Sequence, residues 1–290
     1  MGVSLAVLVV YAFSKQIHHG GVQPDRSTGK TNLDKLRQRS DSVDSLVLLE
    51  WDTAFFGFPI ARIVNPRAHA EELRDAAAQM RERQIPLAYW TADNPSPEAH
   101  AQAIELGATL VDEKLTFVAN VVNLTGHQLP AMPLVEPYHD GMSLAELKQL
   151  AIDSSKYSRF VVDPTFPQTK ARALFEEWMV RSVNKVVADE VIVIRHESHI
   201  AGMVTLAHAG TRASIGLLAV AERFRGRKFG EALVRTAQQK SCDHGCSEVQ
   251  VITQQANAAA QRLYYKCGFE LQKTESCYHL WSTPGFVPPM

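Results

Sequence analysis

The sequence predicts an α/β protein, and three observations support this class. Short apolar runs have the length and composition of buried strands at 87–91, 190–195, 200–207, 213–220 and 248–253. Apolar residues recur at helical spacing in the segments 69–83, 168–184 and 231–240. The two kinds of segment alternate along much of the chain, which is typical of a sheet covered by helices.

The first half is expected to contain, in order, a strand start at 48–51, an aromatic turn at 55–59, a helix at 69–83, a strand at 87–91 and a helix at 99–106. Gly107 closes the last of these helices, because the left-handed residue that ends a helix is usually glycine. One or two strands follow within 109–122. A proline-containing connector, 128–141, then divides the chain.

The second half begins with helices at 144–155 and 168–184, separated by an irregular stretch at 157–167. A short turn at 196–199 joins the next two strands. The remaining elements, in order, are strand 213–220, a glycine-bearing loop, helix 231–240, strand 248–253, helix 258–267 and two strands through Trp281.

Three regions follow: an extension at 1–44, an N-terminal α/β half domain at 45–127 and a C-terminal domain at 142–290. The extension begins with an apolar run, Val3 to Phe13, about half the length that a bilayer span needs. No basic residue precedes this run, so a poorly ordered extension is favoured over a secretion signal.

The amino-acid composition indicates which classes of binding partner the protein is expected to have. The 30 basic and 31 acidic residues nearly cancel, so net charge favours neither nucleic acid nor an anionic membrane. The four cysteines follow position 240 without a disulfide-framework spacing, which is typical of a reducing compartment. We therefore expect a cytoplasmic protein without nucleic-acid or membrane partners. The stretch 24–31 resembles a phosphate loop, but Pro24 replaces the first glycine of that motif.

The two halves echo each other when the first is shifted by 161 positions. The shift places helix 69–83 on 230–244, strand 87–91 on 248–252 and Gly107 on Gly268. Identities are few, so the echo is either a degenerate half-copy or a chance recurrence, and we favour the half-copy. The loop at 64–69, opposite the glycine-bearing loop, contains no glycine, so we expect no cofactor site in the first half.

The loop Arg225-Gly-Arg-Lys-Phe-Gly230 runs from the strand 213–220 into a helix. Gly226 and Gly230 allow a tight turn, so that successive N–H groups can converge at the positive end of the helix. Such a nest suits a pyrophosphate, and Arg225 and Arg227 add positive charge. On geometry alone, a plain strand-to-helix turn is equally admissible.

A second informative stretch is the helix that begins after Asn257. Ala260, Leu263 and Tyr264 share a face of this helix with Asn257, and Gly268 ends it. Taken alone, Tyr264 is ordinarily a core aromatic residue whose hydroxyl reaches water.

Together the two stretches resemble the GNAT superfamily of N-acetyltransferases, which has the loop Arg/Gln-x-x-Gly-x-Gly/Ala and a later Asn…Ala…Leu-Tyr…Gly-Phe helix. The loop matches at Arg225 and Gly230 but has Lys228 in place of the central glycine. The helix matches at Asn257, Ala260, Leu263, Tyr264, Gly268 and Phe269. The resemblance implies a GNAT fold, in which helices flank a mixed central sheet, preceded here by a degenerate GNAT-like half domain.

The resemblance also implies how acetyl-CoA binds as cosubstrate. Its pantetheine would pair with the strand at Leu218, Ala219 and Val220, and its pyrophosphate would lie on Arg225, Gly226, Arg227, Lys228, Phe229 and Gly230. Asn257 would hydrogen-bond the pantetheine arm. Tyr264, which also borders the cofactor, would be the catalytic acid that protonates the thiolate. His208 and Glu222 are the nearest candidates for the base, and a water relay is equally admissible.

Two further stretches resemble the dTDP-fucosamine acetyltransferase group: Trp51-Asp-Thr-Ala-Phe-Phe-Gly-Phe-Pro59, and Ser158-Arg-Phe160 with Asp163-Pro164. Those enzymes acetylate the amine of a nucleotide-linked deoxysugar and also carry a reduced N-terminal half. The resemblance implies that Tyr157, Arg159 and Phe160 contact the acceptor. An ordered loop that caps the sheet is the equal alternative for this segment.

The expected function is transfer of an acetyl group from acetyl-CoA to a primary amine, that of a nucleotide-linked amino sugar by closest resemblance. The alternatives are an acetyltransferase for a protein or small-molecule amine and a non-catalytic acyl-CoA sensor, which Lys228 and the missing base favour. No metal site is expected, because Cys242-x-His244-x-Cys246 fits no common zinc spacing. A homodimer is a candidate assembly.

Overall fold

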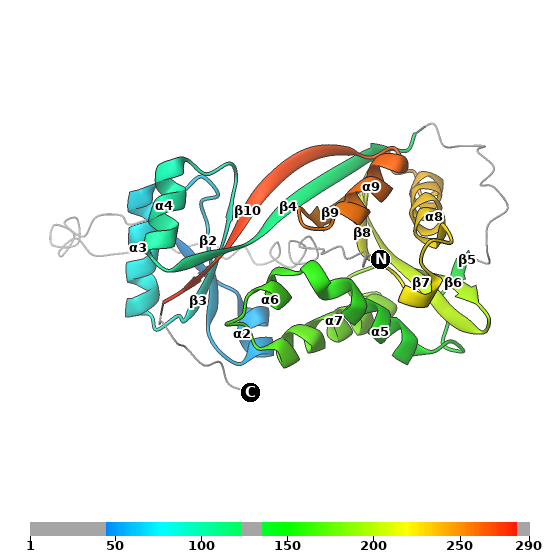
Figure 1. The fold of residues 1–290 in the computed structure, drawn as a ribbon, viewed down its shortest axis with the longest axis horizontal. Coiled ribbons are helices and arrows are strands. Elements are labelled where there is room, and N and C mark those ends of the chain that lie inside the picture. The colour runs from blue at the N-terminus through cyan, green and yellow to red at the C-terminus, as the bar shows by residue number, and fades with distance from the viewer. Residues whose placement is uncertain (1–44, 123–134, 283–290) are drawn as a thin grey trace, which may run out of the picture.

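A computed structural model describes residues 45–122 and 135–282. The extension at 1–44 lies outside the described residues. One mixed sheet of ten strands runs through the described chain (Figure 1), which confirms the expected α/β class. In spatial order its strands are β1 (Leu46–Leu48), β2 (Ile60–Ile63), β3 (Leu87–Ala92), β10 (Glu270–Trp281), β4 (Ala108–Asn120), β9 (Glu248–Gln254), β8 (Arg212–Val220), β7 (His199–Ala209), β6 (Glu190–His196) and β5 (Val135–Pro137).

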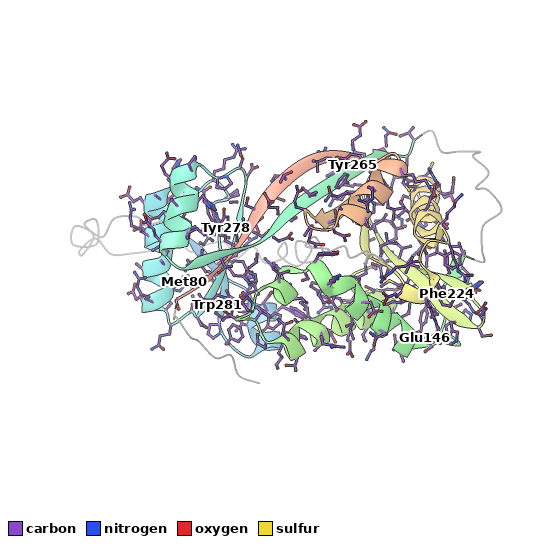
Figure 2. The ribbon with its side chains drawn as sticks, viewed as in Figure 1. Met80, Glu146, Phe224, Tyr265, Tyr278 and Trp281 are labelled. Carbon is purple, nitrogen blue, oxygen red and sulfur yellow. The ribbon has the colours of Figure 1, made fainter. Side chains whose placement is uncertain are left out.

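Two sets of helices cover the two faces of the sheet. One face, called here the α8 face, carries α3 (Ala70–Glu82), α4 (Pro97–Glu105), α8 (Phe229–Asp243) and α9 (Ala258–Lys266). The other, the α7 face, carries α2 (Glu50–Phe56), α5 (Leu144–Ser154), α6 (Arg159–Val162) and α7 (Gln168–Val183). Met80 of α3 and Tyr278 of β10, labelled in Figure 2, share one core cluster on the α8 face.

The two long central strands, β4 and β10, are exchanged between the halves. β4 follows α4 in the first half, yet its residues 114–120 pair with β9 of the second half. β10 follows α9 in the second half, yet its residues 276–281 pair with β3 of the first half. The two strands also pair with each other, and Figure 1 shows them spanning the distance between the two groups of elements. The halves therefore share one continuous sheet.

The strand register reproduces the echo seen in the sequence. Leu115 of β4 lies opposite Thr253 of β9. Their counterparts 161 positions away, Ser276 of β10 and Ala92 of β3, also lie opposite each other. A one-residue slip would move every side chain to the other face of the sheet, so two strand pairs rarely share the same register by chance. We infer from it that the first half is a degenerate copy of the second.

Most of the expected helices and strands begin and end within two residues of the predicted positions. Strand β2 and the short helix α6 are not among the expected elements, and three further segments differ. Residues Glu50–Phe56 form α2 instead of a strand and a turn, because Trp51 and Phe55 stack one helical turn apart at 4.9 Å. The connector contains β5, which pairs with β6. The segment after α9, expected to form two strands, is the single strand β10. Its pairing with β4 shifts register at two points, but the strand continues through both.

Candidate functional site

The site begins where β8 and β9 separate. The two strands pair in parallel only from Arg212 to Ile215 of β8. On its other side, β8 stays paired with β7 as far as Val220, with a register shift between Ile215 and Leu218. Within the described residues, β8 therefore has an unpaired edge facing β9 after Ile215, and we call it the open edge.

Hydrogen bonds identify which backbone groups face the open edge. Leu217 N–H donates to the hydroxyl of Thr205 on β7 at 2.8 Å, and Ala221 N–H donates to the β7 carbonyl of Ala201 at 2.9 Å. Backbone groups two residues apart in a strand point the same way. The alternate residues Leu218 and Val220 therefore turn their N–H groups toward the open edge.

Ala219 lies between these two residues and turns its backbone toward β7. Of the three strand residues expected to hold the cofactor, Leu218 and Val220 are thus placed to pair with an extended amide-bearing ligand. Arg225 Nε donates to the carbonyl of Val220 at 3.2 Å, so this carbonyl is already used at the end of the strand.

The glycine-bearing loop carries the open edge into α8. Gly226 has φ +80° and Lys228 has φ +63°, so Lys228 adopts the left-handed conformation that favours glycine. Lys228 is the N-cap of α8 and makes no side-chain hydrogen bond to the helix end. The first N–H groups of α8, at Phe229 and Gly230, are therefore available to an anion at the positive end of the helix.

The two loop arginines lie at the borders of this nest. The Arg225 side chain folds back onto Val220 and lies 4.0 Å from Glu222. Arg227 lies 3.1 Å from the Nε2 atom of His196 on β6. The backbone therefore forms the floor of the nest, and the arginines contribute positive charge beside it.

The described residues of the first half offer acidic side chains at the position that corresponds to this nest. The corresponding helix, α3, begins at His69, whose N–H donates to the carboxylate of Glu72 at 2.8 Å. Glu71 adds a second acidic side chain to the same first turn. Negative charge thus already occupies this helix end, which disfavours a phosphate there.

Replacement of Gly230 tests the nest. We expect Gly230→Asp to weaken acetyl-CoA binding at least about tenfold, roughly 1.4 kcal/mol, because it adds bulk and negative charge where phosphate approaches. Acidic residues in a first turn stabilise helices, so the fold should persist. Calorimetric titration should give one site per chain in the wild type, with Gly230→Ala as the matched control. Unchanged affinity in the Asp variant would remove the loop from the site.

Asn257 lies fully buried at the start of α9. Its Oδ1 accepts the N–H of Ala260 at 3.2 Å and caps the helix. Ser96, 161 positions earlier, caps α4 by accepting the N–H of Ala99. Both halves therefore have a side-chain cap at the start of the corresponding helix. A contact of Asn257 with pantetheine would be a second role of this residue.

Tyr264 lies on α9 in the same core cluster as Leu218 and Val220. Its side chain is fully buried, and its hydroxyl has no hydrogen-bond partner among the described residues. Burial raises the pKa of this phenol well above its usual value, so the proton stays in place. A buried hydroxyl without a partner among the described residues is costly, and this one is a candidate proton donor.

The segment between α5 and α7 lies on the α7 face. Phe160 packs against Phe56 of α2 with ring centroids 5.8 Å apart, so the two stretches that resemble sugar acetyltransferases meet in space. Phe160 is 2% exposed and anchors the segment in the core. Tyr157 and Arg159, by contrast, are partly exposed.

The α7 face carries a row of polar side chains across β9, β4 and β10. We call this row the polar strip, and it comprises Asp112, Lys114, Gln254, Glu275, Cys277 and His279. These residues share a face because directly paired residues point the same way and the side chains of a strand alternate. Lys114 pairs with Glu275 at 2.8 Å, whereas the buried side-chain oxygen of Gln254 has no hydrogen-bond partner among the residues that the structure describes.

Arg159 lies against the polar strip. Its guanidinium lies 4.1 Å from the ring centroid of Tyr89, and its buried Nε has no hydrogen-bond partner within residues 45–122 and 135–282. Burial raises the pKa of the Asp112 carboxyl to about 7, although the charges of Arg159 and Lys114 oppose this shift. Asp112 thus combines a near-neutral pKa with a neighbouring cation, a combination suited to a general base.

Asp163 fixes the position of this segment. It accepts hydrogen bonds from His279 Nδ1 at 2.6 Å and Trp281 Nε1 at 2.9 Å, both on β10. Burial lowers the pKa of His279 to about 4, so the ring is neutral and donates to the carboxylate. Its other nitrogen, Nε2, is buried and none of the described residues offers it a hydrogen bond.

The two bases considered from the sequence are poorly placed. His208 pairs with Ala213 at the start of β8, five residues before Leu218 or about 16 Å along a strand. Glu222 has 81% of its side chain exposed and lies near Arg225. The sequence missed Asp112 because this residue belongs to β4, a strand of the other half.

Comparisons with known proteins agree with this geometry. Residues 145–269 match the acetyltransferase (GNAT) family. The chain is 29% identical to dTDP-fucosamine acetyltransferase of Escherichia coli O6:H1 over 233 residues, which cover 79% of this chain and 95% of that protein. It is 28% identical to spore coat polysaccharide biosynthesis protein SpsD of Bacillus subtilis over 133 residues, which cover 46% of each chain.

A solved structure shows the same fold. The GCN5-related N-acetyltransferase from Sphaerobacter thermophilus superposes with a TM-score of 0.57 at 16% identity, over 83% of this chain and 77% of that one. The matched part of the chain spans less than half of SpsD. Among the helices of the described residues, none is both long and apolar enough to cross a membrane.

Proposed function

Residues 145–269 form a domain of the acetyltransferase (GNAT) family, and on that premise we propose that the protein acetylates the primary amine of a nucleotide-linked amino sugar with acetyl-CoA. The observation that carries the proposal is the open edge of β8, which leads into the uncapped N-terminus of α8. An extended pantetheine and a pyrophosphate need these two features in this order. The buried hydroxyl of Tyr264 supplies the missing polar partner at the sulfur end.

In the proposed reaction, the general base lies on the α7 face of the sheet and the general acid lies on the α8 face. On the α7 face Asp112 accepts one proton from the ammonium form of the acceptor, and the neutral amine nitrogen then forms a bond to the thioester carbonyl carbon. The N–H of Leu218, which lies farther from the pyrophosphate loop than that of Val220, stabilises the developing oxyanion. The carbon–sulfur bond breaks as Tyr264 donates its proton to the leaving thiolate. The second proton of the former ammonium group then passes through water from the nitrogen to the Tyr264 oxygen, and Asp112 releases its proton to solvent. The products are an amide and coenzyme A.

The positions of the two segments that resemble dTDP-fucosamine acetyltransferases support an amino-sugar acceptor. The segments 51–59 and 158–164 pack on each other beside the polar strip. Arg159 provides a cation there, as a nucleotide-linked acceptor would require. The names of the two relatives, a dTDP-fucosamine acetyltransferase and a spore coat polysaccharide biosynthesis protein, both refer to carbohydrate chemistry.

Release of coenzyme A with a panel of amines tests the acceptor. We expect a dTDP-linked amino sugar to be turned over at least about 100-fold faster, in kcat/KM, than a lysine peptide or an aminoglycoside, a difference of about 2.7 kcal/mol. The free amino sugar without its nucleotide is the matched control and should react slowly. Faster turnover of a peptide than of every nucleotide-linked amine would exclude the proposal.

The non-catalytic sensor loses its main support. Lys228, the departure from the family loop, adopts the left-handed conformation that the family glycine would adopt. The base that the sequence did not locate is supplied by β4. Both features that favoured a sensor are therefore compatible with an enzyme.

A further inference from the structure

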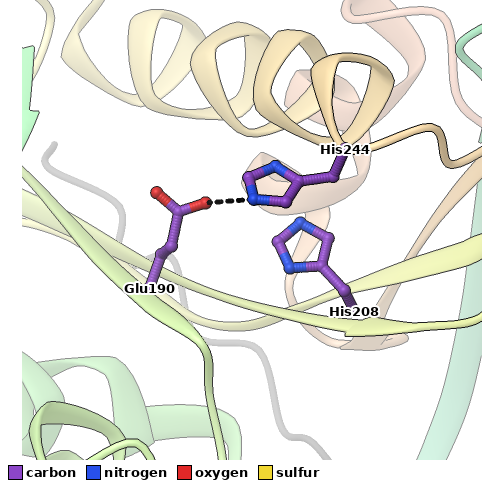
Figure 3. A group of neighbouring side chains, drawn as sticks. All are labelled: Glu190, His208 and His244. Atoms are coloured by element: carbon purple, nitrogen blue, oxygen red, sulfur yellow. Dashed lines mark ion pairs between the residues drawn. The ribbon is translucent and has the colours of Figure 1, made fainter.

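Three titratable side chains meet at the end of the sheet opposite the candidate site. Glu190 begins β6, His208 lies near the end of β7, and His244 follows the last turn of α8 (Figure 3). One ligand atom from each residue lies within 4.8 Å of the other two. The three residues are distant in sequence, so no spacing motif connects them.

Hydrogen bonding fixes the tautomer of His244. Its Nδ1 lies 2.8 Å from the backbone carbonyl of Lys240, and a carbonyl can only accept, so Nδ1 carries the proton. The lone pair of Nε2 then points at Glu190 Oε1, 3.9 Å away. This distance is too long for a hydrogen bond, and Oε1 is buried without any hydrogen-bond partner among the described residues.

His208 completes the group from the other side. Its Nε2 is buried and has no hydrogen-bond partner in the part of the chain that the structure describes, and its ring stacks on His244 with centroids 4.3 Å apart. Its Nδ1 lies 3.4 Å from the carboxylate of Asp189. A carboxylate behind the far nitrogen is the arrangement that orients metal-bound histidines.

We propose that Glu190, His208 and His244 form a Zn²⁺ site of the His₂-carboxylate type. Two ligand atoms about 2.1 Å from a tetrahedral ion lie roughly 3.4 Å apart, so small side-chain shifts would close the site. His244 has half of its side chain exposed, which leaves the fourth position to water. The negative end of the α8 dipole also favours a cation there.

Lys240 competes with the ion for the same carboxylate. Its Nζ lies 2.5 Å from Glu190 Oε2 and neutralises part of the charge that a metal would use. Removal of this cation should therefore tighten metal binding. The sequence-local candidates do not contribute, because Cys242 and Cys246 lie outside the group and only His244 of that motif belongs to it.

Calorimetric titration of the untagged full chain with ZnCl₂, alongside thermal unfolding, tests the site. We expect one ion per chain and a higher Tm with zinc. His208→Gln and His244→Gln should each lose at least about tenfold in affinity, whereas Lys240→Met should gain. The matched control is His199→Gln, which removes a similarly exposed histidine paired with Glu146.

Three results with the wild type and the site variants, and one with the control, would overturn the site. The first three are the absence of saturable zinc binding by the wild type, wild-type affinity in His244→Gln, and unchanged affinity in Lys240→Met. His244 lies on the surface, so its variant should fold even if His208→Gln does not. An effect of His199→Gln equal to that of His244→Gln would show scattered surface binding and would also contradict the proposal.

Discussion

Asp112→Asn is expected to lower kcat of amine acetylation by about 10²–10³, because loss of a positioned general base costs 10²–10⁴. The amide keeps the size of the side chain but does not accept the proton. The wild-type rate should fall below pH 7 as the carboxyl becomes protonated, since its pKa is about 7. The variant should lose this acidic limb. Acetyl-CoA affinity should remain unchanged, which calorimetry can measure separately.

Glu113→Gln is the matched control for this experiment. Glu113 is the next residue of β4, but it is exposed and points to the opposite face of the sheet. Arg159→Met should move the acidic limb to higher pH, because the cation opposes protonation of Asp112. An Asp112→Asn variant that keeps both the wild-type rate and the wild-type pH profile would exclude the base.

Stability gives an independent readout of the same carboxyl. The folded state keeps the Asp112 proton up to about pH 7, whereas an unfolded aspartate releases it near its ordinary pKa of 3.8. Folding is therefore favoured at low pH, and this contribution is lost as pH rises through 7. At pH 8 the Asn variant should resist urea better than the wild type. The difference should shrink toward pH 5.

The sequence predicted the parts of the site that lie close together along the chain. The loop 225–230 and the helix after Asn257 follow consecutive elements, and local rules for glycine, helix caps and helix faces describe them. The structure adds the reason why Lys228 is acceptable there, namely its left-handed backbone. Local chemistry was sufficient for these features.

The remainder depends on pairings between distant segments. Asp112 belongs to a half that the sequence treats as degenerate, and only the exchange of β4 brings it into the site. Glu190, His208 and His244 likewise meet only because the start of β6 lies beside the ends of β7 and α8. Strand exchange leaves no local signal, since each exchanged strand has the ordinary alternation of its own half.

Tyr264→Phe is expected to lower kcat and kcat/KM alike, by about 10², while acetyl-CoA affinity stays nearly unchanged. A coenzyme A thiol has a pKa of roughly 8.5, so the thiolate leaves tolerably even without protonation, and the effect belongs at the lower end of the usual range. The same change should raise Tm, because it removes a buried hydroxyl without a partner, which costs about 1–3 kcal/mol.

A lower kcat together with a higher Tm would distinguish a catalytic role of the Tyr264 hydroxyl from a role in packing alone. If Tyr264 were only a core aromatic residue, phenylalanine would keep the ring contacts with Phe117 and Phe269, and kcat would not change. The control is Tyr265→Phe, since the adjacent tyrosine is 54% exposed and should tolerate the change without effect on rate. A rise in KM alone would mean that the hydroxyl holds the cosubstrate, and a wild-type kcat would remove Tyr264 from the mechanism.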